Sequence, residues 1–133
     1  MSEKQSYFSS VTRGQVIAEF VLDNNGNPIY YHSDGHKNYK IVYKLQSDRA
    51  NEIKKVIYRL DSSYYNPIRE TRNRENNFEL RTSTYGEYPL SVEVHFQDET
   101  VRDNFSITKL LKQTYQSTNN QQIMSAITNI SQN

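Results

Sequence analysis

Two short segments in the middle of the chain hold the residues best suited to chemistry. The first reads Leu60-Asp61-Ser62-Ser63-Tyr64-Tyr65-Asn66-Pro67, and the second reads Thr84-Tyr85-Gly86-Glu87-Tyr88. Each segment sets an aromatic ring in a turn between alternating strands, so we expect Tyr64 and Tyr85 on neighbouring loops. Two rings placed in this way can hold a flat group between them. The pattern therefore indicates a binding slot rather than a catalytic site.

The sequence lacks the patterns on which common enzyme mechanisms depend. It contains no Cys, which excludes thiol nucleophiles, disulfides and Cys-based zinc sites, and its four Gly are not grouped into a phosphate-binding loop. One enzyme hypothesis remains, in which the carboxylates of Asp61 and Glu87 flank the slot and act as an acid and a base. We expect instead a protein that is not an enzyme, with no catalytic residue and no cofactor.

A metal site is a second hypothesis, because His32, Asp34 and His36 offer three ligands within one loop. Alternate residues converge on one ion only in a tight loop, and the Asp34-Gly35 pair is typical of a solvated turn. We therefore favour the turn and expect no metal.

Three arginines, Arg69, Arg72 and Arg74, follow the first segment and are interspersed with Glu70 and Glu75. They suit either contact with an anion or acidic peptide beside the slot or a solvated loop of mixed charge. The alternation of opposite charges favours the solvated loop.

The elements that position the two segments are predicted to be short strands. Alternating or β-branched runs occur at residues 15–22, 39–45, 53–60, 78–82, 90–96 and 101–107, with a shorter strand beginning at 29–31. This pattern predicts an all-β fold, an antiparallel β-sandwich of the immunoglobulin-like type. Its predicted core includes Val56, Tyr58, Leu60, Leu90, Val92, Val94 and Phe96.

The length of 133 residues suits one domain. We assign residues 1–115 to the sandwich, with a short helix or a final strand at 108–115, and residues 116–133 to a polar tail. Within the tail, residues 123–130 can form one or two helical turns that fray. Since a polar tail buries too little apolar surface to offset its ordering entropy, we predict that it is dispensable for folding.

Charge and hydropathy limit the partners. A net charge of +1 argues against a direct nucleic-acid binder that works by neutralising phosphates. The start, Met1 to Tyr7, has no apolar run typical of a signal peptide, and no stretch approaches the roughly 20 apolar residues that span a bilayer. We therefore expect a cytoplasmic protein with no membrane span, and leave its oligomeric state open.

The two segments resemble the core of the YEATS domain, in particular its prokaryotic branch. That family carries a strand ending in Leu-His-x-Ser/Thr-Phe-x-x-Pro and later a Gly-Trp-Gly-Glu-Phe segment before a Val-x-Val strand. The resemblance covers roughly the middle half of the chain. In members that bind acylated lysine, two rings sandwich the acyl amide, while the hydroxyl and backbone amides of these loops bond its carbonyl. The resemblance assigns the rings to Tyr64 and Tyr85, and the hydroxyl to Ser63.

The resemblance implies a ligand site formed by Asp61, Ser63, Tyr64, Thr84, Tyr85 and Gly86. The chain departs from the family pattern at Asp61, which replaces His, at Thr84, which replaces Gly, and at Tyr88, where Phe is common. The charge of Asp61 disfavours acidic acyl groups such as succinyl and tolerates an unmodified ammonium better. Gly86 suits either a left-handed or bulged backbone or an ordinary turn.

The leading hypothesis is a non-enzymatic recognition domain that binds an acylated-lysine peptide or a similar small flat ligand. The family context implies the sensor part of a bacterial signalling or conflict system, which needs a separate effector partner. The alternative is a protein-interaction sandwich without a small-molecule pocket, in which Tyr64 and Tyr85 plug the end of the sandwich and the other tyrosines form an interface.

Overall fold

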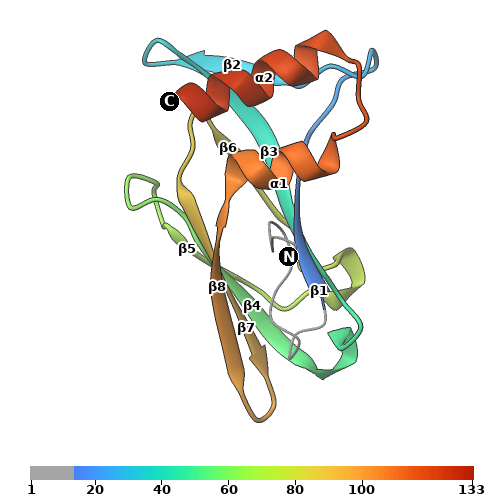
Figure 1. Cartoon of the computed structure of the whole chain (residues 1–133). Coiled ribbons are helices and arrows are strands. Elements are labelled where there is room, and N and C mark those ends of the chain that lie inside the picture. Colours follow the sequence, from blue (N-terminus) through green and yellow to red (C-terminus); the bar gives the residue numbers. More distant parts are fainter. Residues whose placement is uncertain (1–13) are drawn as a thin grey trace, which may run out of the picture.

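Residues 14–133 are described by a computed structural model, in which eight strands form two antiparallel sheets (Figure 1). The first thirteen residues, where we expected no signal peptide, lie outside this range. One sheet contains β1 (Gly14–Phe20), β2 (Tyr30–Ser33), β3 (His36–Ser47) and β6 (Leu80–Thr84). The other has the order β5 (Ile68–Thr71), β4 (Ile53–Arg59), β7 (Pro89–Phe96) and β8 (Thr100–Ser106). The predicted antiparallel sandwich is confirmed.

The long strand β3 organises the first sheet. Strands β1 and β2 both pair with the same edge of β3, one after the other, and β6 pairs with the opposite edge. At Tyr39, β3 pairs with Tyr30 of β2 on one side and with Thr84 of β6 on the other. This register brings the end of β6, where the second turn segment begins, level with the β2–β3 hairpin.

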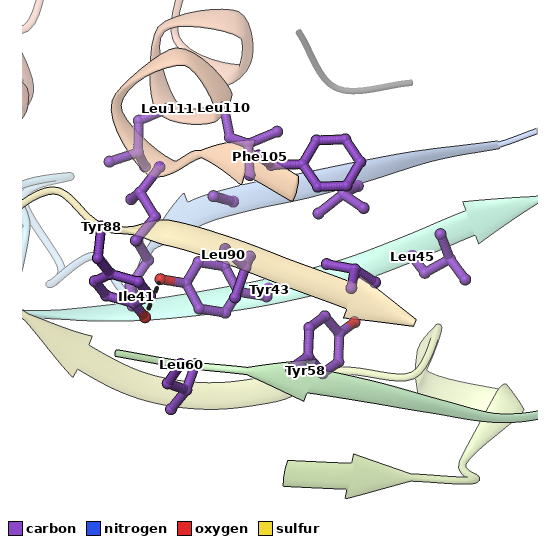
Figure 2. Packing of buried hydrophobic residues seen from close by; sticks show 14 of the residues in the cluster. Ile41, Tyr43, Leu45, Tyr58, Leu60, Tyr88, Leu90, Phe105, Leu110 and Leu111 are labelled. Carbon is purple, nitrogen blue, oxygen red and sulfur yellow. Dashed lines mark hydrogen bonds between the residues drawn. The ribbon is translucent and has the colours of Figure 1, made fainter. Parts of the chain in front are cut away.

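The core lies between the two sheets (Figure 2). The predicted core residues Val56, Tyr58, Leu60, Leu90, Val92, Val94 and Phe96 are all buried. Strict alternation along residues 53–60 would place Ile53 on the opposite face of the strand from Val56, yet Ile53 is 2% exposed. The cause is a shift in the β4–β7 register between Ile53 and Lys55, because an irregularity changes which face the following residues occupy.

Two tyrosines lie fully inside the sandwich with their hydroxyls bonded. Tyr58 donates to the Phe78 carbonyl at 2.7 Å, and the hydroxyls of Tyr43 and Tyr88 are 2.9 Å apart (Figure 2). Burial raises the pKa of both the Tyr43 and the Tyr58 phenol, so both stay neutral at physiological pH. The Tyr43–Tyr88 bond links the core to the second turn segment.

Strand β5 was not predicted, because Arg69 and Glu70 were expected to lie in a solvated loop. Its four residues pair with β4 from Arg59↔Ile68 to Val56↔Thr71, and β5 forms the edge of the second sheet. None of the four is buried. With a single apolar residue in Ile-Arg-Glu-Thr, this edge strand has no periodic apolar signal.

Two helices follow β8. The helix α1 (Ile107–Thr114) begins after Ser106, whose hydroxyl accepts from the Lys109 amide at 3.2 Å. Of the two alternatives predicted for residues 108–115, a short helix and a final strand, the structure has the helix. After α1, the 3.0 Å bond from the Ile123 amide to the Asn120 side chain caps α2 (Gln121–Gln132). Two short 3-10 helices, η1 (Ala50–Glu52) and η2 (Arg74–Asn76), connect strands elsewhere.

The helix α2 is longer than the one or two fraying turns predicted for the tail. Its buried residues, Ile123, Ala126, Ile127 and Ile130, follow helical spacing and join the core. This burial is at odds with a tail that is dispensable for folding, because the helix adds apolar area that the polar composition of the segment conceals. The division of the chain after residue 115 stays a prediction.

The helix α2 crosses one end of the sandwich (Figure 1). At the start of α2, the Asn120 side chain donates to the Gly26 carbonyl at 3.1 Å. In its last turns, the Asn129 side chain donates to the Tyr39 hydroxyl at 2.6 Å. At its end, Asn133 lies against Gly86. The helix thus connects the β1–β2 loop with the second turn segment.

Within residues 14–133, neither helix has the length and apolar character that a membrane-spanning helix requires.

Candidate functional site

A cavity of about 430 Å³ opens where the two turn segments meet the end of α2. Its lining includes all six residues predicted for the site, Asp61, Ser63, Tyr64, Thr84, Tyr85 and Gly86. It also includes Tyr31, Asn38, Ser83, Glu87, Tyr88 and Asn133. The fold therefore brings the predicted residues together, while their role in ligand binding stays a prediction.

The first turn segment is held by local hydrogen bonds. The Asp61 carboxylate accepts from the Ser63 amide at 3.1 Å and from its hydroxyl at 2.6 Å, and the Tyr64 amide donates to the Asp61 carbonyl. The bond from the Leu60 amide to the Pro67 carbonyl, at 2.7 Å, closes the loop. A short, internally bonded loop presents its side chains in a defined direction.

Tyr64 is fixed by the interior of the sandwich. Its ring packs edge-on against Tyr88, with centroids 5.5 Å apart, and its hydroxyl donates to the Ser83 carbonyl at 2.5 Å. Burial raises the pKa of the Tyr64 phenol, so the phenol keeps the proton that it donates. Since Tyr88 is in turn bonded to Tyr43, this wall of the cavity is continuous with the core.

The second turn segment is closed by the hydroxyl of Thr84, which is buried. This hydroxyl accepts from the Gly86 amide at 3.1 Å and donates to the Gly86 carbonyl at 2.7 Å. Gly86 does not have a positive φ, unlike Gly26 and Gly35. A Cβ on Gly86 would lie 2.8 Å from the carbonyl carbon of Asn133, so glycine is needed here for close approach rather than for a left-handed backbone.

Tyr85 has a different support. Its side chain is 46% exposed, and its ring stacks on His36 with centroids 4.2 Å apart and an interplanar angle of 15°. His36 begins β3 directly after Asp34 and Gly35, whose φ values of 53° and 79° form the hairpin turn. A surface hairpin therefore positions this wall.

The same hairpin contains His32, Asp34 and His36, the three residues considered as metal ligands. The rings of His32 and His36 have different partners, because His32 packs edge-on against Tyr30 while His36 stacks on Tyr85. No group of three potential metal ligands occurs in the part of the chain that the structure describes. The predicted turn at Asp34 and Gly35 is present, and His36 has a packing role that the sequence did not reveal.

The cavity is acidic. Its lining residues include the carboxylates of Asp61 and Glu87, and no Lys or Arg. The hydrogen bonds that Ser63 donates hold the pKa of the Asp61 carboxyl below its usual range. Glu87 accepts from the amide and the hydroxyl of Thr108, at 2.7 and 2.6 Å, at the start of α1. Each carboxylate has a structural partner, and together they disfavour an anionic ligand.

The hydroxyl of Ser63 differs from the expectation that it donates to a ligand carbonyl. Its proton is directed to Asp61, so toward a ligand the oxygen can act only as an acceptor. The sequence also missed Tyr31, Asn38 and Asn133 in the lining. The pairing of β2 with β3 brings Tyr31 and Asn38 to the cavity, and the docking of α2 brings Asn133. Neither strand pairing nor helix docking leaves a local signal in the sequence.

Comparisons with known proteins agree with this architecture. Residues 39–103 match the family model of the prokaryotic YEATS domain. A structure of the Yaf9 YEATS domain with a succinylated histone H3 peptide is 18% identical, with a TM-score of 0.51, and the match covers 69% of this chain and 67% of that chain. Yeast Yaf9 is 15% identical, with a TM-score of 0.50 and coverage of 71% and 70%.

A third structure, the Yaf9 domain bound to an acetylated histone H3 peptide, is 19% identical, with a TM-score of 0.50 and coverage of 69% and 66%. The search of curated proteins gave no match. At these identities the solved structures establish the fold. Two of these neighbours are binding domains that were solved with histone peptides.

Proposed function

Because residues 39–103 match the family model of the prokaryotic YEATS domain, we propose that the protein is a recognition domain for an acylated lysine of a partner protein. The observation that carries this proposal is that all six predicted residues line one and the same cavity. The Yaf9 domain, which shares the fold, has been solved with acylated histone peptides. The ligand class proposed for this chain follows from that likeness and from the chemistry of the cavity.

In the proposed complex, the acyl amide lies between the rings of Tyr64 and Tyr85. An amide is flat and neutral, so it can stack on tyrosine without the cost of burying a charge. The oxygen of Ser63 accepts from the amide N–H, because its own proton is held by Asp61. The carboxylates of Asp61 and Glu87 select neutral acyl groups, such as acetyl or crotonyl, over succinyl.

The proposal includes the setting inferred from the family. The domain acts as the sensor part of a bacterial signalling or conflict system, in the cytoplasm, and passes its signal to a separate effector. A chain without Cys is compatible with a reducing compartment.

A protein-interaction surface without a small ligand is the second candidate. The observation in its favour is the set of large side chains left exposed on β2, β5 and the two turn segments, Tyr30, Tyr31, Tyr65, Ile68 and Tyr85. Tyrosine is enriched at the centre of interfaces. In this case the partner binds equally well with an unmodified lysine.

Titration calorimetry with acetyl-, propionyl-, butyryl- and crotonyl-lysine peptides tests the proposal. We expect Tyr64→Ala and Tyr85→Ala each to weaken binding by about 1–3 kcal/mol, and Tyr85→Phe to bind like the wild type, because stacking uses the ring. The matched control is Tyr65→Ala, since Tyr65 neighbours Tyr64 but is 87% exposed and does not line the cavity.

Three outcomes decide among the candidates. No binding of any acylated peptide by the wild type retires the acyl-lysine assignment. Unchanged affinity in both alanine variants retires the slot. Equal affinity for acylated and unmodified peptides favours the interaction surface.

A further inference from the structure

A second cavity, of about 530 Å³, lies beside the slot and carries the opposite charge. Its lining includes the cationic side chains of Lys40, Arg69 and Arg81, with Val21, Tyr31, Ile41, Thr82 and Ser83, and no Asp or Glu. The three cations come from β3, β5 and β6, so only the folded sandwich gathers them. Because Arg81 is paired with Glu79 at 2.5 Å, an anionic group in this cavity would meet uncompensated positive charge mainly from Lys40 of β3 and Arg69 of β5.

Tyr31 and Ser83 belong to the lining of both cavities. Their hydroxyls are 2.9 Å apart, although Tyr31 pairs with Asn38 on one edge of β3 and Ser83 pairs with Lys40 on the other. The Tyr31 side chain therefore reaches across β3 and forms a ridge between the acidic slot and the cationic cavity. A peptide that crosses this ridge would contact the acidic slot on one side and the cationic cavity on the other.

Arg69 is positioned for an incoming anion. Its Nη2 donates to the Tyr65 carbonyl at 3.0 Å, and its Nε donates to the Asn66 carbonyl. Carbonyl oxygens orient a guanidinium without cancelling its charge. These carbonyls belong to the loop that supplies Asp61, Ser63 and Tyr64 to the slot, so one loop sets the geometry of both cavities.

The other arginines of this region are engaged elsewhere. Arg72 pairs with Glu70 at 2.9 Å, and Arg74 donates to the carbonyls of Ala50 and Ile53. Arg81 bonds Glu79 at 2.5 Å, and Lys40 has no carboxylate partner among residues 14–133. The sequence suggested a solvated loop of mixed charge for the three arginines after the first segment. The structure separates Arg69 from Arg72 and Arg74.

We propose that Lys40 and Arg69, in the cavity that Arg81 also lines, bind the carboxylate of an Asp or Glu that flanks the acylated lysine in the same peptide. This inference rests on the proposed function and adds the partner's sequence preference and direction of binding. The opposite charges on the two sides of Tyr31 admit the acyl-lysine on one side and the acidic residue on the other. The reversed arrangement places the carboxylate beside Asp61 and Glu87, where it is repelled.

The test is calorimetry with acylated-lysine peptides in which one Glu is moved a residue at a time along either side of the lysine, against matched Gln peptides. We expect one side to bind about three- to tenfold tighter with Glu, as for an ion pair at a partly open surface, and this gain to shrink with added salt. Lys40→Gln and Arg69→Gln should reduce the gain and leave the Gln-peptide affinity unchanged, whereas Tyr85→Ala should weaken both peptides equally.

Arg72→Gln is the matched control, because Arg72 lies near Arg69 in sequence but outside the cavity, and it should keep the full gain. If Arg69→Gln also lowers the affinity for the Gln peptide, we conclude that the loop of Tyr65 and Asn66 has moved. The Lys40→Gln variant alone then decides whether the cavity binds the Glu side chain. A gain for Glu on neither side, or one that survives the Lys40→Gln/Arg69→Gln double variant, overturns the inference while the proposed function stands. Failure of both peptides to bind overturns both. Tighter binding of a single-stranded oligonucleotide than of the acidic peptide also overturns the inference.

Discussion

The two tyrosine walls of the slot are supported in different ways. Tyr64 packs on Tyr88 and bonds the Ser83 carbonyl, and through Tyr88 it is connected to the sandwich core. Tyr85 is half exposed and stacks on His36 of a surface hairpin. One wall is thus part of the folded core, and the other rests on the surface.

This difference teaches that two residues of the same type can contribute to stability to different degrees while they line one cavity. Substitutions at Tyr64 should change both the free energy of unfolding and the affinity for ligand, whereas substitutions at Tyr85 should change affinity alone. The turn that carries Tyr85 has a further support, because Asn133 at the end of α2 lies against Gly86.

The largest expected effect concerns α2, which supports the second turn but not the first. Ile130→Ala should lower the free energy of unfolding by about 2–5 kcal/mol, because Ile130 is fully buried in the core. Chemical denaturation measures this loss, and Met124→Ala, on the exposed side of the same helix, is the control. In NMR spectra the Gly86 amide should shift more than the Ser63 amide; equal shifts would contradict the separate supports.

Gly86→Ala tests the close approach directly. The added Cβ meets backbone atoms of Asn133, so we expect a loss of about 1–3 kcal/mol in the free energy of unfolding, as for other overpacked sites. Gly26 has open space around its Cβ position but a φ of 79°, so Gly26→Asn, which tolerates that φ, serves as the control. Stability equal to the wild type would show that α2 does not press on the turn.

A smaller difference in unfolding free energy is expected between the phenylalanine variants of Tyr64 and Tyr85. Tyr64→Phe removes the donor to the Ser83 carbonyl and should cost about 0.5–1.5 kcal/mol of unfolding free energy. Tyr85→Phe should leave that free energy within about 0.5 kcal/mol, since the site is half exposed. Thermal and chemical unfolding of the pair provide the measurement, and equal losses would remove the distinction between the walls.

The smallest effect is a change in titration. Ser63→Ala removes the hydroxyl donor that lowers the Asp61 pKa, so the pKa should rise toward its ordinary value. A lowered folded-state pKa stabilises the fold above the unfolded pKa of about 4, and this contribution is lost as the pH falls through the folded-state pKa. NMR titration of Asp61 should show the rise, and an unchanged pKa would mean that other groups set it.

The sequence predicted the strands that bury one face, because alternation is a local signal. It also predicted both turn segments, since each lies between two such strands. It missed β5, which contains a single apolar residue, and underestimated α2, whose buried apolar residues are diluted by polar ones. His36, Tyr31 and Asn133 reach the slot through strand pairing and helix docking, which connect residues far apart in the chain.

The connected tyrosines also give the protein an optical property. The chain contains eleven Tyr and no Trp, so its ultraviolet emission comes from tyrosine alone. The rings of Tyr58 and Tyr43 lie 6.2 Å apart, and those of Tyr88 and Tyr64 lie 5.5 Å apart. Excitation energy can pass between rings this close. A group that stacks on Tyr64 can therefore quench the emission of the neighbouring tyrosines as well as that of Tyr64. If a ligand stacks on Tyr64 as proposed, the tyrosine emission of the unlabelled protein should report its binding.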